Sequence, residues 1–384
     1  MVQLTTAEQS TIEALIECIG SAMHQLETVE AAYANKTKLQ KLLYLSIDEF
    51  DLSVTYSWYL AGAVSPGDAA TPAGLHSTMA DLPQPDAPSS PTTTDTELDD
   101  SPSDMSSPSS NNPEETDDAE TDITDIVEDS TLSLEDESDI PNPILFSDVS
   151  SSDDEVDPLD GQREDIIEFY ISVIPDVWQQ NTMRFLQNFY LEHAPSQFQD
   201  LYVTSTHLRT RLRDIEKTVA AHLNGETPSQ ELASLSKAIG QDISDLHCSI
   251  RQSDTLNETF TAVVAGTDVI EDGLMMLANH EADELQSEHL DMVEAMQEFF
   301  YYWVWRYPCL IISKQTAQGP SAADLREARR ETLTKFEDDL IDRTAAFDEE
   351  LATAGLRPGP DDYQAVGDEV DEAISSLADQ YFSH

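Results

Sequence analysis

Side chains that could bind a metal ion or transfer protons lie closest together between residues 280 and 289. His280 and Glu284 are four residues apart, which places them on one face of a helix, and Glu288 and His289 follow. Imidazole and carboxylate groups can hold a divalent cation, so one hypothesis is a metal-dependent enzyme built on His280, Glu284 and His289. The other interpretation, which we favour, is a solvated acidic helix face without metal, because one residue in five is acidic.

Familiar catalytic motifs are missing from the sequence. It has no glycine-rich phosphate loop, no Gly-x-Ser-x-Gly, no Cys-x-x-Cys and no His-Glu-x-x-His. Cys18, Cys248 and Cys309 are odd in number and far apart, which argues against a disulfide framework and fits a reducing cytoplasm. The most apolar stretch, residues 299–312, is too short to span a bilayer and contains Arg306. We therefore expect a cytoplasmic protein with no enzymatic activity and no cofactor.

Net charge excludes two classes of partner. The chain has 384 residues, 76 acidic and 19 basic, and a formal charge of −57. Bare nucleic acid and anionic lipid bind clustered Lys and Arg, so neither is an expected direct partner. The acidic excess extends through every segment, which is typical of proteins from a high-salt cytosol such as that of a haloarchaeon, where salt screens self-repulsion. The alternative is an acidic DNA-mimic inhibitor, which requires the charge to gather on one face.

The acidic residues are densest in the middle of the chain. Residues 67–160 hold 27 acidic residues and no Lys or Arg, and they are rich in Ser, Thr and Pro. Like charges repel at this density, and too few apolar residues are present to offset the entropy of ordering. The sequence therefore predicts three parts: an N-terminal helical unit over 1–66, a disordered acidic insert over 67–160, and a helical bundle over 161–384 that packs with the first unit.

Three of the seven lysines fall within residues 36–41. On a helix, Lys38, Lys41 and Leu45 form a strip beside an apolar face. One interpretation is a solvent face whose lysine stems cover apolar surface. The other is a docking strip for a protein partner, or the place where the acidic insert folds back.

The same segment carries a resemblance to a known family. The string Lys38 to Leu45, the aromatic pair Trp58 and Tyr59, and the turn at Gly62 to Ser65 resemble the N-terminal signature of the Panacea antitoxin-like family, over about residues 10–65. Ala63 stands where that family has proline. The resemblance implies a mainly α-helical domain without enzymatic activity, which acts as an antitoxin or adaptor and binds a protein such as a toxin. The residues expected to contact that partner are Lys38, Lys41, Tyr44, Leu45, Trp58 and Tyr59.

Apolar residues recur at helical spacing on both sides of the insert. The spacing predicts helices from Thr6 and from Asn35, then a short strand near Trp58. Further on, it predicts a bundle whose clearest seam runs from Leu256 to Leu277 and whose central helix contains residues 299–305. A long helix begins near Ser321, and a last one covers residues 363–381. Arg209 and Arg213 share one face of an earlier helix, and we expect them to form ion pairs between helices. The predicted fold class is all-α.

Overall fold

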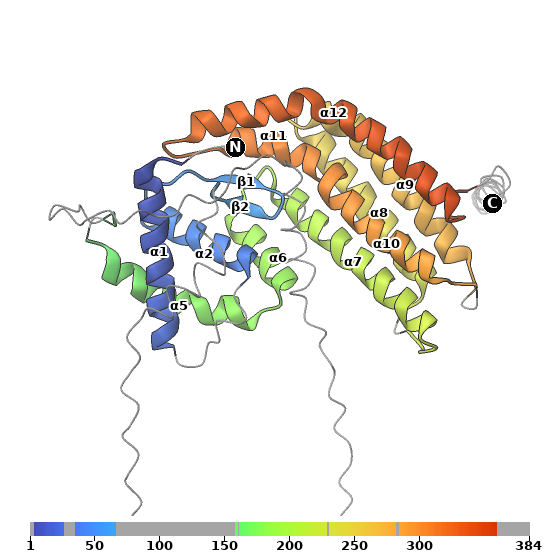
Figure 1. Cartoon of the computed structure of the whole chain (residues 1–384), viewed down its shortest axis with the longest axis horizontal. Helices are drawn as coiled ribbons and strands as arrows, with labels where there is room; N and C mark the ends of the chain where they lie inside the picture. The colour runs from blue at the N-terminus through green and yellow to red at the C-terminus, as the bar shows by residue number, and fades with distance from the viewer. Residues whose placement is uncertain are drawn as a thin grey trace, which may run out of the picture.

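The computed structural model describes residues 4–26, 35–66, 158–159, 161–228, 230–281 and 284–358. Within these ranges the chain is helical apart from one short hairpin, which confirms the all-α prediction and the predicted strand. An N-terminal unit lies at one end of an arch and a helical bundle at the other, and one long helix runs along the top (Figure 1). The predicted acidic insert, apart from residues 158 and 159, and the predicted last helix lie outside the described residues.

The N-terminal unit is built from helices on both sides of the acidic stretch. A capping box formed by Thr5 and Glu8 begins its first helix, which starts at Thr6 as predicted. Asn35 caps the second helix. The elements of this unit are α1 (Thr6–Gln25), α2 (Lys36–Glu49), β1 (Ser57–Tyr59), β2 (Gly62–Val64), α5 (Arg163–Gln179) and α6 (Thr182–His193).

The bundle consists of long helices that pack side by side (Figure 1). The predicted seam is buried, since Leu256, Val263 and Ile270 have no exposed surface. Gly266 lets α9 approach Val304 closely, because a Cβ there would lie 2.6 Å from Val304 Cγ2. The bundle elements are α7 (Gln199–Leu223), α8 (Leu232–Gln252), η3 (Asn257–Thr259), α9 (Phe260–Asn279), α10 (Ser287–Phe299), η4 (Phe300–Val304), α11 (Arg306–Thr316) and α12 (Ala322–Thr353).

One short element interrupts the regular helix in the centre of the bundle. Residues Phe300–Val304 of η4 form a π-helical turn, and the Trp305 N–H donates to the Phe300 carbonyl at 2.7 Å. Such turns contain one more residue than an α-helical turn and are frequent at functional sites. Helices α10 and α11 flank η4 with only Trp305 between η4 and α11, so the three elements follow one another without a loop.

A single apolar core joins the two parts of the chain. Residues from α1, α2 and the hairpin belong to the same buried cluster as residues from α7 to α12. Helix α1 packs on α5, and β1 packs on α11. Leu159, which the sequence assigns to the insert, is fully buried in this core.

Glu8 ties the beginning of α1 to the beginning of α12. Its side chain is 1% exposed and accepts hydrogen bonds from the Thr55 N–H at 2.8 Å and the Ser321 hydroxyl at 2.6 Å. It also accepts from the N–H and hydroxyl of Thr5, at 2.9 and 2.8 Å. Burial alone would raise the pKa of Glu8, but these hydrogen bonds outweigh burial and lower it to about 2. The Ser321 hydroxyl therefore bonds to Glu8 and makes no capping hydrogen bond to its own helix.

Candidate functional site

The predicted docking lysines lie inside the protein. Lys41 has no exposed surface, and its Nζ donates to the Ala63 carbonyl at 2.8 Å and lies 5.7 Å from the centre of the Phe189 ring. Burial lowers the pKa of Lys41 to about 7. Lys38 is 5% exposed, with Nζ 5.9 Å from the centre of the Trp178 ring. A side chain without exposed surface cannot contact a partner while the fold is intact, so Lys41 supports the hairpin, whereas Lys38 packs against Trp178 of α5.

Two of the four other predicted contact residues are buried as well. Tyr44 and Trp58 pack edge to face with ring centres 5.7 Å apart, and both are buried. Leu45 and Tyr59 are partly exposed. Of the six residues, Tyr59 is the one that takes part in the charged cluster described next, because it lies at the end of β1 where the hairpin meets the bundle.

Hydrogen bonds from two helices of the bundle fix the hairpin. The Ser57 and Ser313 hydroxyls are 2.8 Å apart, and the Trp58 N–H donates to the Thr316 hydroxyl at 2.9 Å. The Tyr202 hydroxyl donates to the Tyr59 carbonyl at 2.8 Å. The ring N–H of Trp305 donates to the Leu60 carbonyl at 2.9 Å. Tyr59 is therefore held at a defined place against α7 and α11.

Around Tyr59, arginines from three helices converge. Arg306 Nε donates to the Tyr59 hydroxyl at 3.0 Å, and the Arg329 guanidinium lies 4.1 Å from the centre of the Tyr59 ring. Arg209 lies 4.0 Å from the centre of the Tyr301 ring. We call these five residues the arginine–tyrosine cluster. They come from β1, α7, η4, α11 and α12, and apart from the buried Tyr301 they are partly exposed.

No carboxylate neutralises this cluster within the described residues. The ion pairs of the described chain involve other cations, and none includes Arg209, Arg306 or Arg329. Burial lowers the pKa of Arg329, and the positive charge of Arg306 lowers it further. Arg329 Nε donates to the Ser313 hydroxyl at 3.0 Å, which fixes one edge of the guanidinium. The cluster therefore concentrates positive charge in a strongly acidic protein.

Cys309 lies next to the cluster but is not placed for catalysis. Its thiol is fully buried, and burial raises its pKa well above the usual value, although Tyr202, Arg329 and Arg209 each oppose that shift. A buried thiol with a raised pKa is a poor nucleophile.

The neighbouring arginines of α7 behave differently from one another. Arg211 forms the predicted kind of ion pair, with Asp242 of α8, and donates to the Ala238 carbonyl at 3.1 Å. Arg213 is 8% exposed, and burial lowers its pKa, with Arg209 adding to the shift. The ion pairs expected at Arg209 and Arg213 are therefore absent among the described residues: the pair between helices forms at Arg211, and Arg209 stacks on an aromatic ring.

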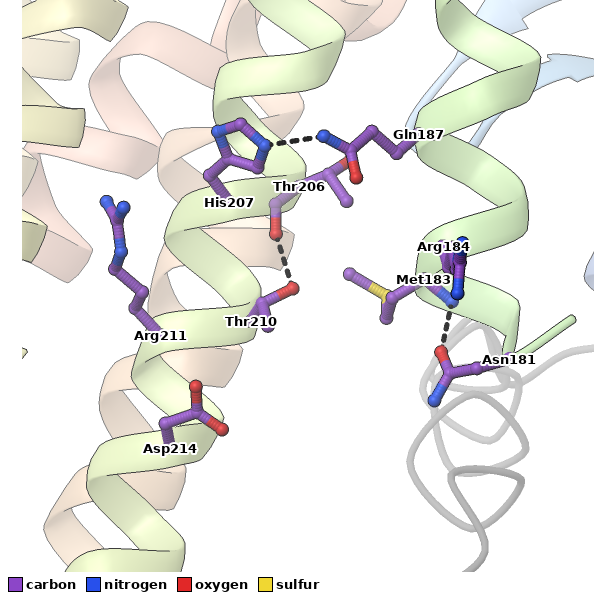
Figure 2. A pocket seen from close by; sticks show the side chains of 9 residues that line it. All are labelled: Asn181, Met183, Arg184, Gln187, Thr206, His207, Thr210, Arg211 and Asp214. Carbon is purple, nitrogen blue, oxygen red and sulfur yellow. Dashed lines mark hydrogen bonds between the residues drawn. The ribbon is translucent and has the colours of Figure 1, made fainter. Parts of the chain in front are cut away.

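A groove of about 600 Å³ lies between α6 and α7 (Figure 2). Gln187 and His207 join its two walls, with Nε2 atoms 2.8 Å apart. The hydroxyls of Thr206 and Thr210 each donate to the backbone carbonyl four residues earlier. Arg211 is held by Asp242, so most polar groups of the groove already have partners within the chain. The remaining lining residues are Asn181, Met183, Arg184 and Asp214.

The histidines that suggested a metal site do meet, but the Nδ1 atom of each ring is engaged with the backbone. The ring centres of His280 and His289 are 4.8 Å apart. His280 Nδ1 is 2.8 Å from the Met276 carbonyl, and His289 Nδ1 accepts from the Gln286 N–H at 3.3 Å. Glu284 accepts from the N–H of Glu281 instead of joining them. Within the described ranges, no three His, Cys, Asp or Glu side chains converge as metal ligands.

Searches for similar proteins relate the chain to one family. No helix in the described part of the chain has the length and apolar character needed to cross a membrane. No curated protein and no solved structure matches the sequence. A family model described as a domain of unknown function matches residues 1–383.

That match contradicts the Panacea resemblance, which is wrong. The string from Lys38 to Leu45 is a buried helix packed against a hairpin, an arrangement that depends on local patterning and that unrelated helical proteins can share. Ala63, the departure from the Panacea pattern, is fully buried in β2 and pairs with Trp58. Because the matching model spans nearly the whole sequence, the chain belongs to the family described as Domain of unknown function (DUF8098).

Proposed function

We propose that this chain is a non-catalytic protein-binding module, and that its arginine–tyrosine cluster holds an oxyanion, carboxylate or phosphate, carried by a protein partner. The observation that carries the proposal is the absence of a described carboxylate beside Arg209, Arg306 and Arg329 in a chain with 76 acidic residues. The antitoxin role came with the Panacea resemblance and is not part of this proposal.

The geometry of the arginines supports an oxyanion as the ligand. Stacking on a tyrosine ring uses the face of a guanidinium and leaves the N–H groups at its edge available. Arg209 makes no described hydrogen bond, and Arg306 and Arg329 each use Nε alone, so their terminal N–H groups lack acceptors among the described residues. Such forked donors match carboxylate and phosphate oxygens, and the bonds are about twice as strong as neutral ones.

Partly buried positive charge without a counter-ion also costs stability, and a bound anion would recover that cost. The net charge of −57 makes a long polyanion such as nucleic acid a poor ligand, because repulsion outside the site opposes its approach. A short anionic segment of a protein can place one or two oxyanions at the cluster while the rest of the partner stays away. This reasoning favours a protein ligand.

The experiment is a peptide-binding titration followed by fluorescence polarisation. The probes are a labelled Asp- and Glu-rich peptide, the same peptide with phosphoserine in place of the acidic residues, and a neutral Ser and Gln version. We expect both anionic peptides to bind and the neutral one not to bind. Arg329→Gln should weaken binding about 10- to 100-fold, since a hydrogen bond to a charged group contributes about 1.5–3 kcal/mol.

Arg330→Gln is the matched control, because Arg330 is the next residue on α12, is 69% exposed and already pairs with Glu327. Binding that Arg330→Gln weakens as much as Arg329→Gln would reflect general charge and would refute the assignment of the site. A second test uses a variant in which every Asp and Glu of residues 67–157 is changed to Asn or Gln. If no anionic peptide binds this variant, the proposed function itself is refuted.

A further inference from the structure

The chain enters and leaves its acidic middle stretch at two anchored points on the N-terminal unit. Just before that stretch, the Ser65 N–H donates to Gln40 Oε1 at 3.0 Å and the Ser65 hydroxyl donates to the Thr55 carbonyl at 2.7 Å. Just after it, Leu159 is fully buried in the core. Residues 67–157 are therefore tethered at both ends to the part of the molecule that carries Tyr59.

The tether begins close to the arginine–tyrosine cluster. Val64 pairs with Ser57 at one end of the hairpin, and Tyr59 pairs with Gly62 at the other. Two residues of strand separate these positions, or about 7 Å at 3.3–3.4 Å per residue. At up to about 3.3–3.6 Å per residue, a stretch of 91 residues is many times longer than this distance. Nothing in the length of the stretch prevents its side chains from reaching the cluster.

Charge complementarity identifies the ligand. Residues 67–157 contain 26 Asp and Glu and no Lys or Arg, so every charged side chain in the stretch, histidine aside, is an oxyanion. The cluster presents three guanidinium groups without described carboxylate partners. Carboxylates, which residues 67–157 supply in many copies, are the groups that these guanidinium groups bind.

We propose that carboxylates of residues 67–157 bind the arginine–tyrosine cluster in cis and compete there with the anionic segment of the partner. The inference rests on the proposed function, because it assumes that the cluster binds oxyanions. A tethered ligand acts at an effective concentration of the order of millimolar, so a partner segment with the same intrinsic affinity must exceed that concentration to displace it. Only a tighter ligand, such as a phosphorylated or better matched segment, replaces the chain's own carboxylates at lower concentration.

Two variables, salt and protein concentration, distinguish a charged contact in cis from the same contact made by a second copy of the chain. A contact between exposed charges weakens as the Debye length falls from about 10 Å at 0.1 M salt to about 3 Å at 1 M. A contact in cis is independent of protein concentration. If the acidic stretch of a second copy filled the cluster instead, occupancy would rise with concentration.

The experiment measures how fast phenylglyoxal modifies individual arginines in the intact chain, read by peptide mass spectrometry. Rates at Arg209, Arg306 and Arg329 are divided by the rate at Arg330, which is exposed. The comparison chain has the same length, with every Asp and Glu of residues 67–157 changed to Asn or Gln. Circular dichroism and thermal melting of both chains verify that the described fold is kept.

We expect the three cluster arginines of the native chain to react at least about fivefold more slowly at low salt than in the neutralised chain, at any protein concentration. High salt should remove the difference, because screening weakens the charged contact. Equal relative rates in both chains at low salt would overturn the inference, and so would protection that rises with protein concentration.

The peptide titration then distinguishes this failure from failure of the proposed function. We expect the neutralised chain to bind the anionic peptide at least about tenfold more tightly than the native chain at low salt. If both chains bind it equally and Arg329→Gln abolishes binding in both, the cis contact is refuted and the proposed function stands. If the neutralised chain binds no anionic peptide, the proposed function is refuted, together with the competition inferred from it.

Discussion

Glu8 offers the sharpest test of how the fold is held together. The variant Glu8→Gln keeps the size of the side chain but removes the charge that accepts hydrogen bonds from Thr5, Thr55 and Ser321. The pKa of Glu8 falls from 4.5 in an unperturbed carboxyl to about 2 in the folded protein. A difference of this size corresponds to about 3 kcal/mol at 1.36 kcal/mol per pKa unit.

The sign follows from linkage between protonation and folding. A carboxyl group whose folded pKa is lowered stabilises the protein fully above its unfolded pKa, and the contribution is lost as pH falls through the folded value. The native chain should therefore exceed Glu8→Gln in free energy of unfolding by about 3 kcal/mol at pH 7. The gap should narrow below pH 4.5 and close near pH 2.

Urea denaturation of both chains at matched high salt gives the two free energies at each pH. Many other carboxyl groups titrate in the same range, but they are common to both chains, so the difference isolates Glu8. Glu13→Gln is the control, because Glu13 lies on the same helix and is exposed. A gap that stays constant between pH 7 and pH 3 would refute the reasoning, since it would mean that the charge of Glu8 contributes nothing.

Two further changes test the packing around the site. The pKa of Lys41 is lowered from 10.5 to about 7 in the folded protein. Between pH 7 and pH 10.5, Lys41 is therefore protonated in the unfolded chain and largely neutral in the folded one. The free energy of unfolding of the native chain should rise with pH across that range. This rise should total several kcal/mol in the native chain and should be absent from Lys41→Met, as measured by urea denaturation between pH 6 and pH 10. If the free energy of unfolding depends on pH in the same way in both chains, the prediction is contradicted. Gly266→Ala should lower the free energy of unfolding by about 1–3 kcal/mol, because the new Cβ meets Val304 Cγ2 at 2.6 Å. Gly240→Ala is its matched control on α8, where the new Cβ meets only the end of the Glu271 side chain, and equal melting curves for both alanine variants would argue against the close approach at Gly266.

Periodicity predicted the parts of the fold that depend on neighbours in sequence. The seam from Leu256 to Leu277, the strand near Trp58 and the long helix after Ser321 all form as expected, because each is a local pattern of apolar residues and caps. Predictions about exposure were less successful. A helix with Lys38 and Lys41 beside its apolar face suggests a solvated strip, and the covering aromatic residues Trp178 and Phe189 come from distant segments.

The arginine–tyrosine cluster could not be predicted from local sequence patterns, because its residues come from distant segments of the chain. Tyr59 and Arg329 are 270 positions apart, and their contact depends on how β1 docks against α11 and α12. One signal was available in the sequence. Arg306 interrupts the most apolar stretch of a chain with very few basic residues, and a charge kept in such surroundings indicates a specific role.

The π-helical turn of η4 sets the rotational phase of everything that follows it. An α-helix turns by 100° per residue, so the additional residue in Phe300–Val304 rotates α11 by that angle relative to an uninterrupted helix. If the same residues continued as a regular α-helix, Trp305 and Arg306 would be rotated by about 100° and would point away from Leu60 and Tyr59. The π-helical turn thus lets Arg306 face Tyr59 while α10 stays packed on α7.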